Sequence, residues 1–242
     1  PEVPLVVPEV NPQAILKHKG IIANPNCSTI IMVMALKPIY DLAKIKRVIV
    51  STYQAVSGAG KEGIDELDAQ VREHSEGREM TANILPSASA EKHYPIAFNL
   101  IPQIDVFCDN LYTKEEMKMV NETKKIMEDY EMRITATTIR VPVYRSHSES
   151  VNIELEKEVD LGAMREALAK FPGVTVQDDP SKQEYPMPLY TSEKDDVYVG
   201  RLRRDESWEK SYNMWVVGDQ IRKGAALNTL QIAETMIKNG WI

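Results

Sequence analysis

The sequence predicts an α+β fold built on a mixed, largely antiparallel sheet with helices on one face. Two observations support this prediction. The chain of 242 residues contains both β-branched runs typical of strands and amphipathic runs at helical spacing. These runs do not alternate strictly, as they would in a parallel β-α-β sheet, and no G-x-G-x-x-G turn joins a strand to a helix.

Five segments carry helix signals. After Cys27, apolar residues such as Ile30 and Val33 repeat at helical spacing, and we expect Pro38 to kink or break that helix. The clearest helix opens with a Thr113 cap and two acidic residues in its first turn. The expected helices are 28–42, 61–74, 113–130, 161–170 and 220–239.

Five further segments are rich in β-branched and aromatic residues, which favour strands. The first of them runs into a glycine loop at 54–60, and the second and third are separated by the polar connection 145–148. The expected strands are 46–53, 133–144, 150–157, 197–203 and 212–217.

Charge and composition exclude several classes of protein. The net charge is −7, so no basic surface is available for general nucleic-acid binding. No apolar run approaches the roughly 20 residues of a membrane span, and no signal peptide is visible. Two cysteines do not form a disulfide framework, and we identify no metal-ligand set. We expect a cytoplasmic protein that binds neither nucleic acid nor a membrane.

The strongest chemical signal is Cys27 within N-P-N-C-S-T. A cysteine at the start of a helix has its thiolate stabilised by the helix dipole and by unpaired N–H groups, so Cys27 is a candidate nucleophile near neutral pH. The alternative is a small buried residue that happens to precede a helix. Cys108, between Phe107 and Asp109, lacks such a setting, and we expect it in the core.

Five segments resemble motifs of the aspartate-semialdehyde dehydrogenase family, and they occur in the family's order along nearly the whole chain. Any one segment alone would be weak evidence, whereas five segments in the family's order are strong evidence. The segments are 24–29, 54–60, 115–118, 140–147, and 218–220 together with 223–226.

The resemblance implies a reaction in which NADPH reduces an aspartyl phosphate to aspartate semialdehyde and phosphate is released. Cys27 would form a thioester, which divides one difficult step into two easier ones. His147 would be the acid/base that takes the thiol proton. Gln54 would orient the substrate beside the sulfur. Without the resemblance, His147 would be read as a solvated turn residue.

The resemblance also assigns substrate contacts. Arg140 would hold the α-carboxylate, Glu115 the α-amino group, and Lys118 and Asn26 the phosphate. Glu115 and Lys118 share a helix face, although this spacing is also common in surface ion pairs. Arg140 and His147 would lie on opposite faces of one straight strand, so we expect a bend between them, near Pro142 or 145–146.

The family implies a glyceraldehyde-phosphate-dehydrogenase-like C-terminal domain, normally attached to an N-terminal Rossmann domain. Residues 1–25 would be the tail of that NADP-binding domain, 26–219 the catalytic and dimerisation domain, and 220–242 a helix that packs back on the NADP-binding domain. Ser57, Gly58, Gly60 and Gln220 would contact the NADP cofactor. We expect a homodimer, or a dimer of dimers, that pairs through the sheet.

Other classes stay open at this stage. The N-acetyl-glutamyl-phosphate reductases share the chemistry but normally carry Gly and Tyr around the cysteine, where this chain has Asn26 and Ser28. The phosphorylating glyceraldehyde dehydrogenases have a Thr-rich motif that is not seen here. A thiol hydrolase would use Cys27 and His147 but leave Arg140 without a role. A non-catalytic oligomerisation module is the remaining reading.

Overall fold

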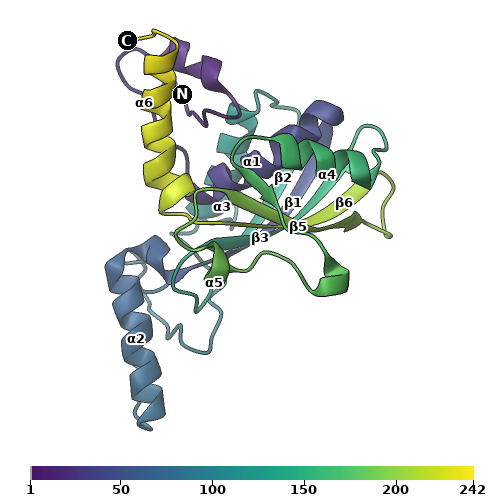
Figure 1. Cartoon of the computed structure of the whole chain (residues 1–242). Coiled ribbons are helices and arrows are strands. Elements are labelled where there is room, and N and C mark those ends of the chain that lie inside the picture. The colour runs from purple at the N-terminus through teal and green to yellow at the C-terminus, as the bar shows by residue number, and fades with distance from the viewer. Residues whose placement is uncertain (1) are drawn as a thin grey trace.

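The computed structural model describes residues 2–242, and its centre is one six-stranded sheet (Figure 1). The strand order is β2-β1-β3-β6-β5-β4. β1 pairs in parallel with β2 and β4 with β5, while the other three neighbouring pairs are antiparallel. The strands are β1 Ile45–Gln54, β2 Arg133–Arg140, β3 His147–Leu155, β4 Val174–Val176, β5 Val197–Arg204 and β6 Ser211–Gly218. The prediction of a mixed, largely antiparallel sheet is confirmed.

Three helices cover one face of the sheet and bury the main core against it. Helix α1 crosses the middle, α4 lies over β4 and β5, and α3 packs on β2. Alternate apolar residues of the strands, such as Val48, Val151 and Val216, point to these helices and are fully buried. The helices are α1 Cys27–Leu42, α3 Lys114–Ile126 and α4 Leu161–Lys170.

The opposite sheet face carries partly buried and polar side chains. Tyr53 and Trp215 lie there with ring centroids 5.5 Å apart, and Asn152 donates to Asn213 at 3.0 Å. An antiparallel sheet leaves one face to water or to a partner when helices cover only the other.

Two helices extend from the body (Figure 1). α2 (Lys61–Ser75) projects from the end of the glycine loop, while α6 (Leu227–Lys238) lies beside the N-terminal segment and packs on the short helix η1 (Pro12–Lys17). The remaining short elements are η2 Val56–Ala59, η3 Pro180–Lys182, α5 Pro188–Thr191 and the π-helical turn η4 Arg222–Ala226.

Several expectations differ from the structure in detail. α1 continues through Pro38 to Leu42, because most of the helix is buried and tertiary packing outweighs the lost backbone bond. The last helix begins with a π-helical turn and becomes α-helical only at Leu227. β4 was not expected, since three residues carry little pattern. Cys108 is partly exposed and is not a core residue. Pro1, within the expected 1–25 segment, lies outside the described residues.

Candidate active site

One edge of the sheet gathers the predicted catalytic side chains. Gln54 ends β1 and Arg140 ends the parallel strand β2, and these two residues are register partners. His147 begins the neighbouring strand β3 at the same edge. Helix α1 begins at Cys27, close enough to Arg140 that each group shifts the pKa of the other. The sheet edge and the helix start therefore form one site.

Arg140 and His147 approach each other although seven positions separate them. β2 ends at Arg140, and the chain turns before β3 begins, with Ser146 at a φ of +70°. A Cβ added to Gly58 would lie 2.7 Å from Arg140 Nη1 and 3.3 Å from His147 Cε1. Both side chains therefore converge on Gly58, and the expected bend is confirmed.

Cys27 lies between a polar cap and a glycine. Asn26 is the N-cap of α1, and its side-chain oxygen accepts the N–H of Thr29 at 3.1 Å. On the other side, a Cβ added to Gly224 of the π-helical turn would lie 3.0 Å from the Cβ of Cys27. Only glycine at position 224 allows this close approach of backbone to the cysteine.

The pKa of Cys27 is not the low value that its helix position suggested. Desolvation around the sulfur raises the pKa of the thiol to about 12, although the residue as a whole is partly exposed, and the negative charge of Glu115 also raises it. Arg140 and a hydrogen bond from the Ser28 backbone lower the pKa but do not offset burial. A helix start favours an anion by about 0.3–1 kcal/mol, less than about one pKa unit, so desolvation wins. Desolvation therefore favours the neutral thiol of Cys27 over the thiolate.

His147 is neutral and fully buried. Burial, followed by the nearby charge of Arg140, holds the pKa of the imidazole well below its ordinary value. The N–H of Ala55 donates to Nδ1 at 3.1 Å. A neutral ring that accepts at Nδ1 carries its proton on Nε2. Nε2 has no hydrogen-bond partner among the described residues, so this donor is available to a ligand.

Arg140 is a buried cation with spare donors. Nη1 donates to the carbonyl oxygen of Ala55 at 2.8 Å and Nη2 to that of Pro86 at 3.5 Å, while Nε has no partner within residues 2–242. Burial lowers the pKa of the guanidinium, although Cys27 and Glu115 oppose that shift. A desolvated guanidinium bonded mainly to neutral carbonyl groups is suited to bind an anion.

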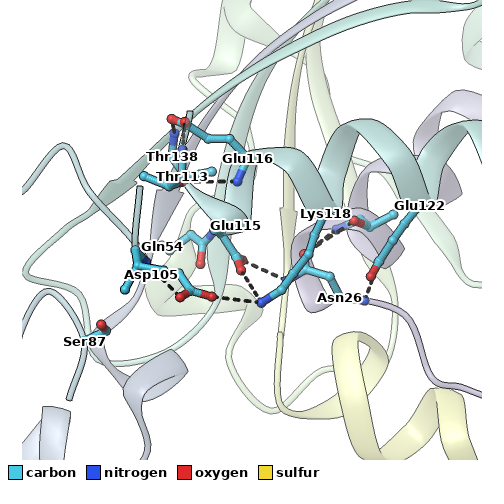
Figure 2. Close-up of polar contacts among 12 residues, drawn as sticks. Asn26, Gln54, Ser87, Asp105, Thr113, Glu115, Glu116, Lys118, Glu122 and Thr138 are labelled. Atoms are coloured by element: carbon cyan, nitrogen blue, oxygen red, sulfur yellow. Dashed lines mark hydrogen bonds and ion pairs between the residues drawn. The ribbon is translucent and has the colours of Figure 1, made fainter. Parts of the chain in front are cut away.

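Glu115 is the centre of a polar network that Figure 2 shows. One carboxylate oxygen accepts the side-chain amides of Asn26 at 2.8 Å and Gln54 at 3.2 Å, and the other accepts Lys118 at 3.4 Å. A capping box formed by Thr113 and Glu116, the residue after Glu115, fixes the start of α3. These contacts hold the carboxylate of Glu115, a hydrogen-bond acceptor, near Cys27.

Lys118 is the most accessible member of the network, with 44% of its side chain exposed. Besides Glu115 it contacts Asp105, at 3.2 Å. Burial alone would lower the pKa of Lys118, but these two carboxylates raise it, so the ammonium stays charged. Among residues 2–242, its ion-pair partners are these two carboxylates.

Two members of the network were not expected from the sequence. Glu122 accepts the backbone N–H of Asn26 at 2.7 Å and thereby ties α3 to the residue before Cys27. Its spacing from Glu115 and Lys118 places it on the same helix face, a signal that was present in the sequence. Asp105 follows an irregular segment and has a φ of +68°, and no pattern marks it.

The glycine loop and Gln220 have different environments. Gly58 and Gly60 are exposed, and nothing would lie within 4 Å of a Cβ on Gly60, whereas a Cβ on Gly58 would lie against His147 and Arg140. Gln220 is 3% exposed, and its amide is already bonded to Ser146 and to the hydroxyl of Ser57.

Residues 2–242 contain neither a candidate metal site nor a candidate membrane span. Histidine, cysteine and carboxylate side chains nowhere form a group of three that could hold a metal ion. None of the described helices is both long and apolar enough to cross a bilayer.

Comparison with known proteins identifies close relatives. Residues 36–223 match the family model described as semialdehyde dehydrogenase, dimerisation domain. The chain is 55% identical to an aspartate-semialdehyde dehydrogenase of Aquifex aeolicus over 244 residues, an alignment that covers 100% of this chain and 70% of the relative. It is 52% identical to an aspartate-semialdehyde dehydrogenase of Bacillus subtilis, covering 97% of this chain and 68% of the relative.

Solved structures agree with this match. Aspartate semialdehyde dehydrogenase II from Vibrio cholerae, complexed with ASA, superposes with a TM-score of 0.91 at 46% identity, over 98% of this chain and 68% of that one. The aspartate semialdehyde dehydrogenase with NADP from Candida albicans superposes with a TM-score of 0.72 at 26% identity, over 100% of this chain and 68% of that one.

Proposed function

This chain belongs to the aspartate-semialdehyde dehydrogenase family, and from that premise we propose that it catalyses the NADPH-dependent reductive dephosphorylation of L-aspartyl 4-phosphate to L-aspartate 4-semialdehyde. The observation that carries the proposal is the setting of Cys27. Its thiol lies within electrostatic reach of one buried cation, Arg140, and one buried anion, Glu115. A substrate that carries an α-carboxylate and an α-ammonium on one carbon, and an acyl group one methylene further along, would match that pair.

The acyl transfer is assigned to Cys27. Its sulfur attacks the acyl carbon, the bond from that carbon to the phosphate oxygen breaks, and a thioester and inorganic phosphate result. Reduction of the thioester by one hydride and one proton then gives the aldehyde and restores the thiol. Because desolvation raises the pKa of the Cys27 thiol, its proton must pass to a base as the sulfur attacks.

The proton transfers are assigned to His147. With Ala55 donating to Nδ1, the Nε2–H can donate a hydrogen bond to an oxyanion that forms on the acyl carbon. In this tautomer only the lone pair of Nδ1 can accept a proton, and the N–H of Ala55 occupies it. The ring must therefore break the bond from Ala55 before it can accept the Cys27 proton. His147 therefore begins the cycle as a hydrogen-bond donor and becomes a base only after this rearrangement.

The substrate contacts follow from charge and position. Arg140 would bind the α-carboxylate through its spare donors, and Glu115 the α-ammonium. Lys118 and Asn26 would bind the phosphate. Lys118 would break its hydrogen bond to Asp105 and donate to the phosphate instead. Gln54, already bonded to Glu115 at the edge of β1, would orient the substrate next to the sulfur.

Ser57, Gly58 and Gly60 would hold the nicotinamide end of NADPH, since the exposed loop backbone lies beside His147. When bound, the cofactor supplies the hydride. The loop itself packs on Arg140 and His147, which fixes the surface on which a ring would lie. Residues 2–25 and 220–242, which pack together through Ile15 and Ile232, would join the catalytic region 26–219 to an NADP-binding domain.

The assembly proposed is a homodimer, or a dimer of dimers, formed through the open face of the sheet around Tyr53 and Trp215. The match to a dimerisation-domain family supports it. The reaction would serve the biosynthesis of the aspartate-family amino acids, namely lysine with diaminopimelate, methionine and threonine.

The test is NADPH oxidation coupled to phosphate release, measured on the whole natural protein with aspartyl phosphate and with N-acetyl-glutamyl phosphate. We expect turnover with aspartyl phosphate only. Cys27→Ala should abolish turnover and covalent labelling by a slow acylating analogue, whereas Cys108→Ala should leave both nearly intact. Turnover only with N-acetyl-glutamyl phosphate would identify the protein as an N-acetyl-glutamyl-phosphate reductase. Turnover with neither substrate, from a folded protein, would leave an oligomerisation module.

A further inference from the structure

Lys223 is a buried ammonium that joins the N-terminal segment, the π-helical turn and helix α6. It lies in the π-helical turn, and its side chain is 1% exposed. Its Nζ donates to Glu9 Oε2 at 2.5 Å, to Asn228 Oδ1 at 3.1 Å and to Gln231 Oε1 at 2.7 Å. An ammonium has three N–H donors, so these three oxygens satisfy it. This cation has no role in the proposed reaction, although it is buried near the nucleophile.

The residue after Lys223 lies against Cys27. A Cβ added to Gly224 would be 3.0 Å from the Cβ of Cys27 and 3.4 Å from its carbonyl oxygen. The turn that carries Gly224 is π-helical, a rare conformation that occurs mostly as single turns within helices. Because the conformation is rare, contacts outside the turn must hold it. The side chain of Lys223 supplies three such contacts.

The same ammonium reaches the other side of Cys27 through Asn228. The side chain of Asn228 is fully buried, and its Oδ1 accepts from Lys223. Its Nδ2 donates to Asn24 Oδ1 at 2.8 Å and to the carbonyl oxygen of Val6 at 2.9 Å. Asn24 lies three residues before Cys27, in the segment that leads into α1. Cys27 therefore lies between two segments, and both are joined to Lys223.

We propose that Lys223 is a positioning residue, which holds Gly224 and, through Asn228, Asn24, and thereby fixes the place of the Cys27 sulfur. This inference rests on the proposed function, because it concerns the nucleophile of that reaction. Without the ammonium, the turn loses the contacts that hold it and Gly224 moves away from Cys27. Water then reaches the sulfur.

The experiment compares Lys223→Met with Arg165→Met in the whole natural protein. Methionine keeps most of the aliphatic chain of lysine but makes none of its three bonds. Arg165, on α4, is a matched control because it pairs at 2.9 Å with Asp178, a carboxylate that is 1% exposed. Each variant leaves a mostly buried carboxylate without its cation, Glu9 in one case and Asp178 in the other. Only Lys223 is joined to the segments on both sides of the cysteine.

A milder variant acts on one side of Cys27 only. Asn228→Leu keeps the approximate size of the side chain and keeps the ion pair between Lys223 and Glu9. It removes the hydrogen bond to Asn24. Its effect on Cys27 should have the same direction as that of Lys223→Met and be smaller.

The first readout is the rate at which iodoacetamide alkylates Cys27 across pH 6–10, followed by mass spectrometry in a Cys108→Ala background. Desolvation is the largest cause of the high pKa of the thiol, so water that reaches the sulfur should lower that pKa. Each unit of decrease raises the thiolate fraction about tenfold and lowers the reactivity of the thiolate about threefold. We therefore expect alkylation near pH 8 to be ~3- to 10-fold faster in Lys223→Met and unchanged in Arg165→Met.

Turnover should change in the opposite direction. We expect kcat for aspartyl phosphate to fall ~10- to 100-fold in Lys223→Met, the scale of a small misplacement of a reacting group. KM should change by less than about threefold. Arg165→Met should keep kcat within about twofold of wild type even where it lowers Tm. Loss of stability alone would instead affect the two variants alike.

The alkylation rates decide the proposal independently of turnover. Slower alkylation in Lys223→Met would make Lys223 a countercharge to the thiolate, and an unchanged rate would mean that Cys27 keeps its place without it. An equal increase in Arg165→Met would show a general loosening of the fold. Each of these results would overturn the proposal, and Asn228→Leu decides by the same criteria if Lys223→Met does not fold. If the wild-type protein turns over neither acyl phosphate but the alkylation rates differ as expected, only the proposed function has failed.

Discussion

The carboxylate of Glu115 raises the pKa of the Cys27 thiol, while the guanidinium of Arg140 lowers it. These two groups are the ones proposed to bind the α-ammonium and the α-carboxylate of the substrate. An ammonium placed on Glu115 would cancel part of the negative charge that disfavours the thiolate. A carboxylate placed on Arg140 would cancel part of the positive charge that favours the thiolate, so the two ends of the substrate act on the pKa of Cys27 in opposite directions.

The first prediction tests this coupling with charge-removing variants. Glu115→Gln should lower the pKa of Cys27, because a negative neighbour is lost, and Arg140→Gln should raise it, because a positive one is lost. The rate of alkylation by iodoacetamide, followed by mass spectrometry across pH 6–10 in a Cys108→Ala background, reports the thiolate fraction. Near pH 8, Glu115→Gln should react faster than its parent and Arg140→Gln more slowly. Shifts in the same direction in both variants would show that burial, and not charge, controls the thiol.

The second prediction concerns Arg140→Lys, which keeps the charge. A lysine cannot present two parallel donors to a carboxylate, nor reproduce the bond to the Ala55 carbonyl from the same position. We expect kcat/KM for aspartyl phosphate to fall by an amount equivalent to about 2–5 kcal/mol, mostly through KM. Steady-state kinetics measure this, and near-normal values would mean that Arg140 acts only as a distant countercharge.

The third prediction concerns Gly224→Ala. The added Cβ would lie 3.0 Å from the Cβ of Cys27 and close to its backbone, so the cysteine or the π-helical turn must shift. We expect kcat to fall by ~10-fold or more, with little change in Tm, because the displaced group is the nucleophile. Ala225→Ser, one residue along the same turn, is the control and should stay near wild type. Equal kinetics in the two variants would show that the turn adapts without moving Cys27.

Much of the site could be anticipated because its residues lie at recognisable places in the fold. Cys27 follows an Asn N-cap, which the pattern predicted, whereas Gln54 and Arg140 were assigned from the family resemblance and only the structure shows that their strands pair in parallel. The ionisation of Cys27 could not be anticipated, because it depends on burial by segments distant in sequence. For the same reason the hydrogen bond from Gln220 to Ser57 could not be anticipated, because 163 positions separate the two residues along the chain.

The last prediction concerns Glu149, which lies on β3 two residues after His147. Its side chain is fully buried, and neither carboxyl oxygen has a hydrogen-bond partner in the part of the chain that the structure describes. Burial raises the pKa of Glu149 well above its ordinary value, so the folded protein keeps a proton that the unfolded chain releases near pH 4.3, roughly the value for a free glutamate. The stability that this proton contributes is fully present below the pKa of the unfolded state. It is lost as pH rises through the pKa of the folded state.

Glu149→Gln should therefore change the pH dependence of stability in a defined direction. An amide cannot ionise, so the variant should gain free energy of unfolding relative to wild type as pH rises from 5 to 8, and the difference should be smallest at pH 5. Urea unfolding at several pH values measures this difference, in which the contributions of all other titrating groups cancel. Glu149→Leu, which also cannot ionise, should show the same trend even if its absolute stability differs through packing. A difference between Glu149→Gln and wild type that stays constant from pH 5 to 8 would mean that the carboxyl group of Glu149 titrates alike in the folded and unfolded states.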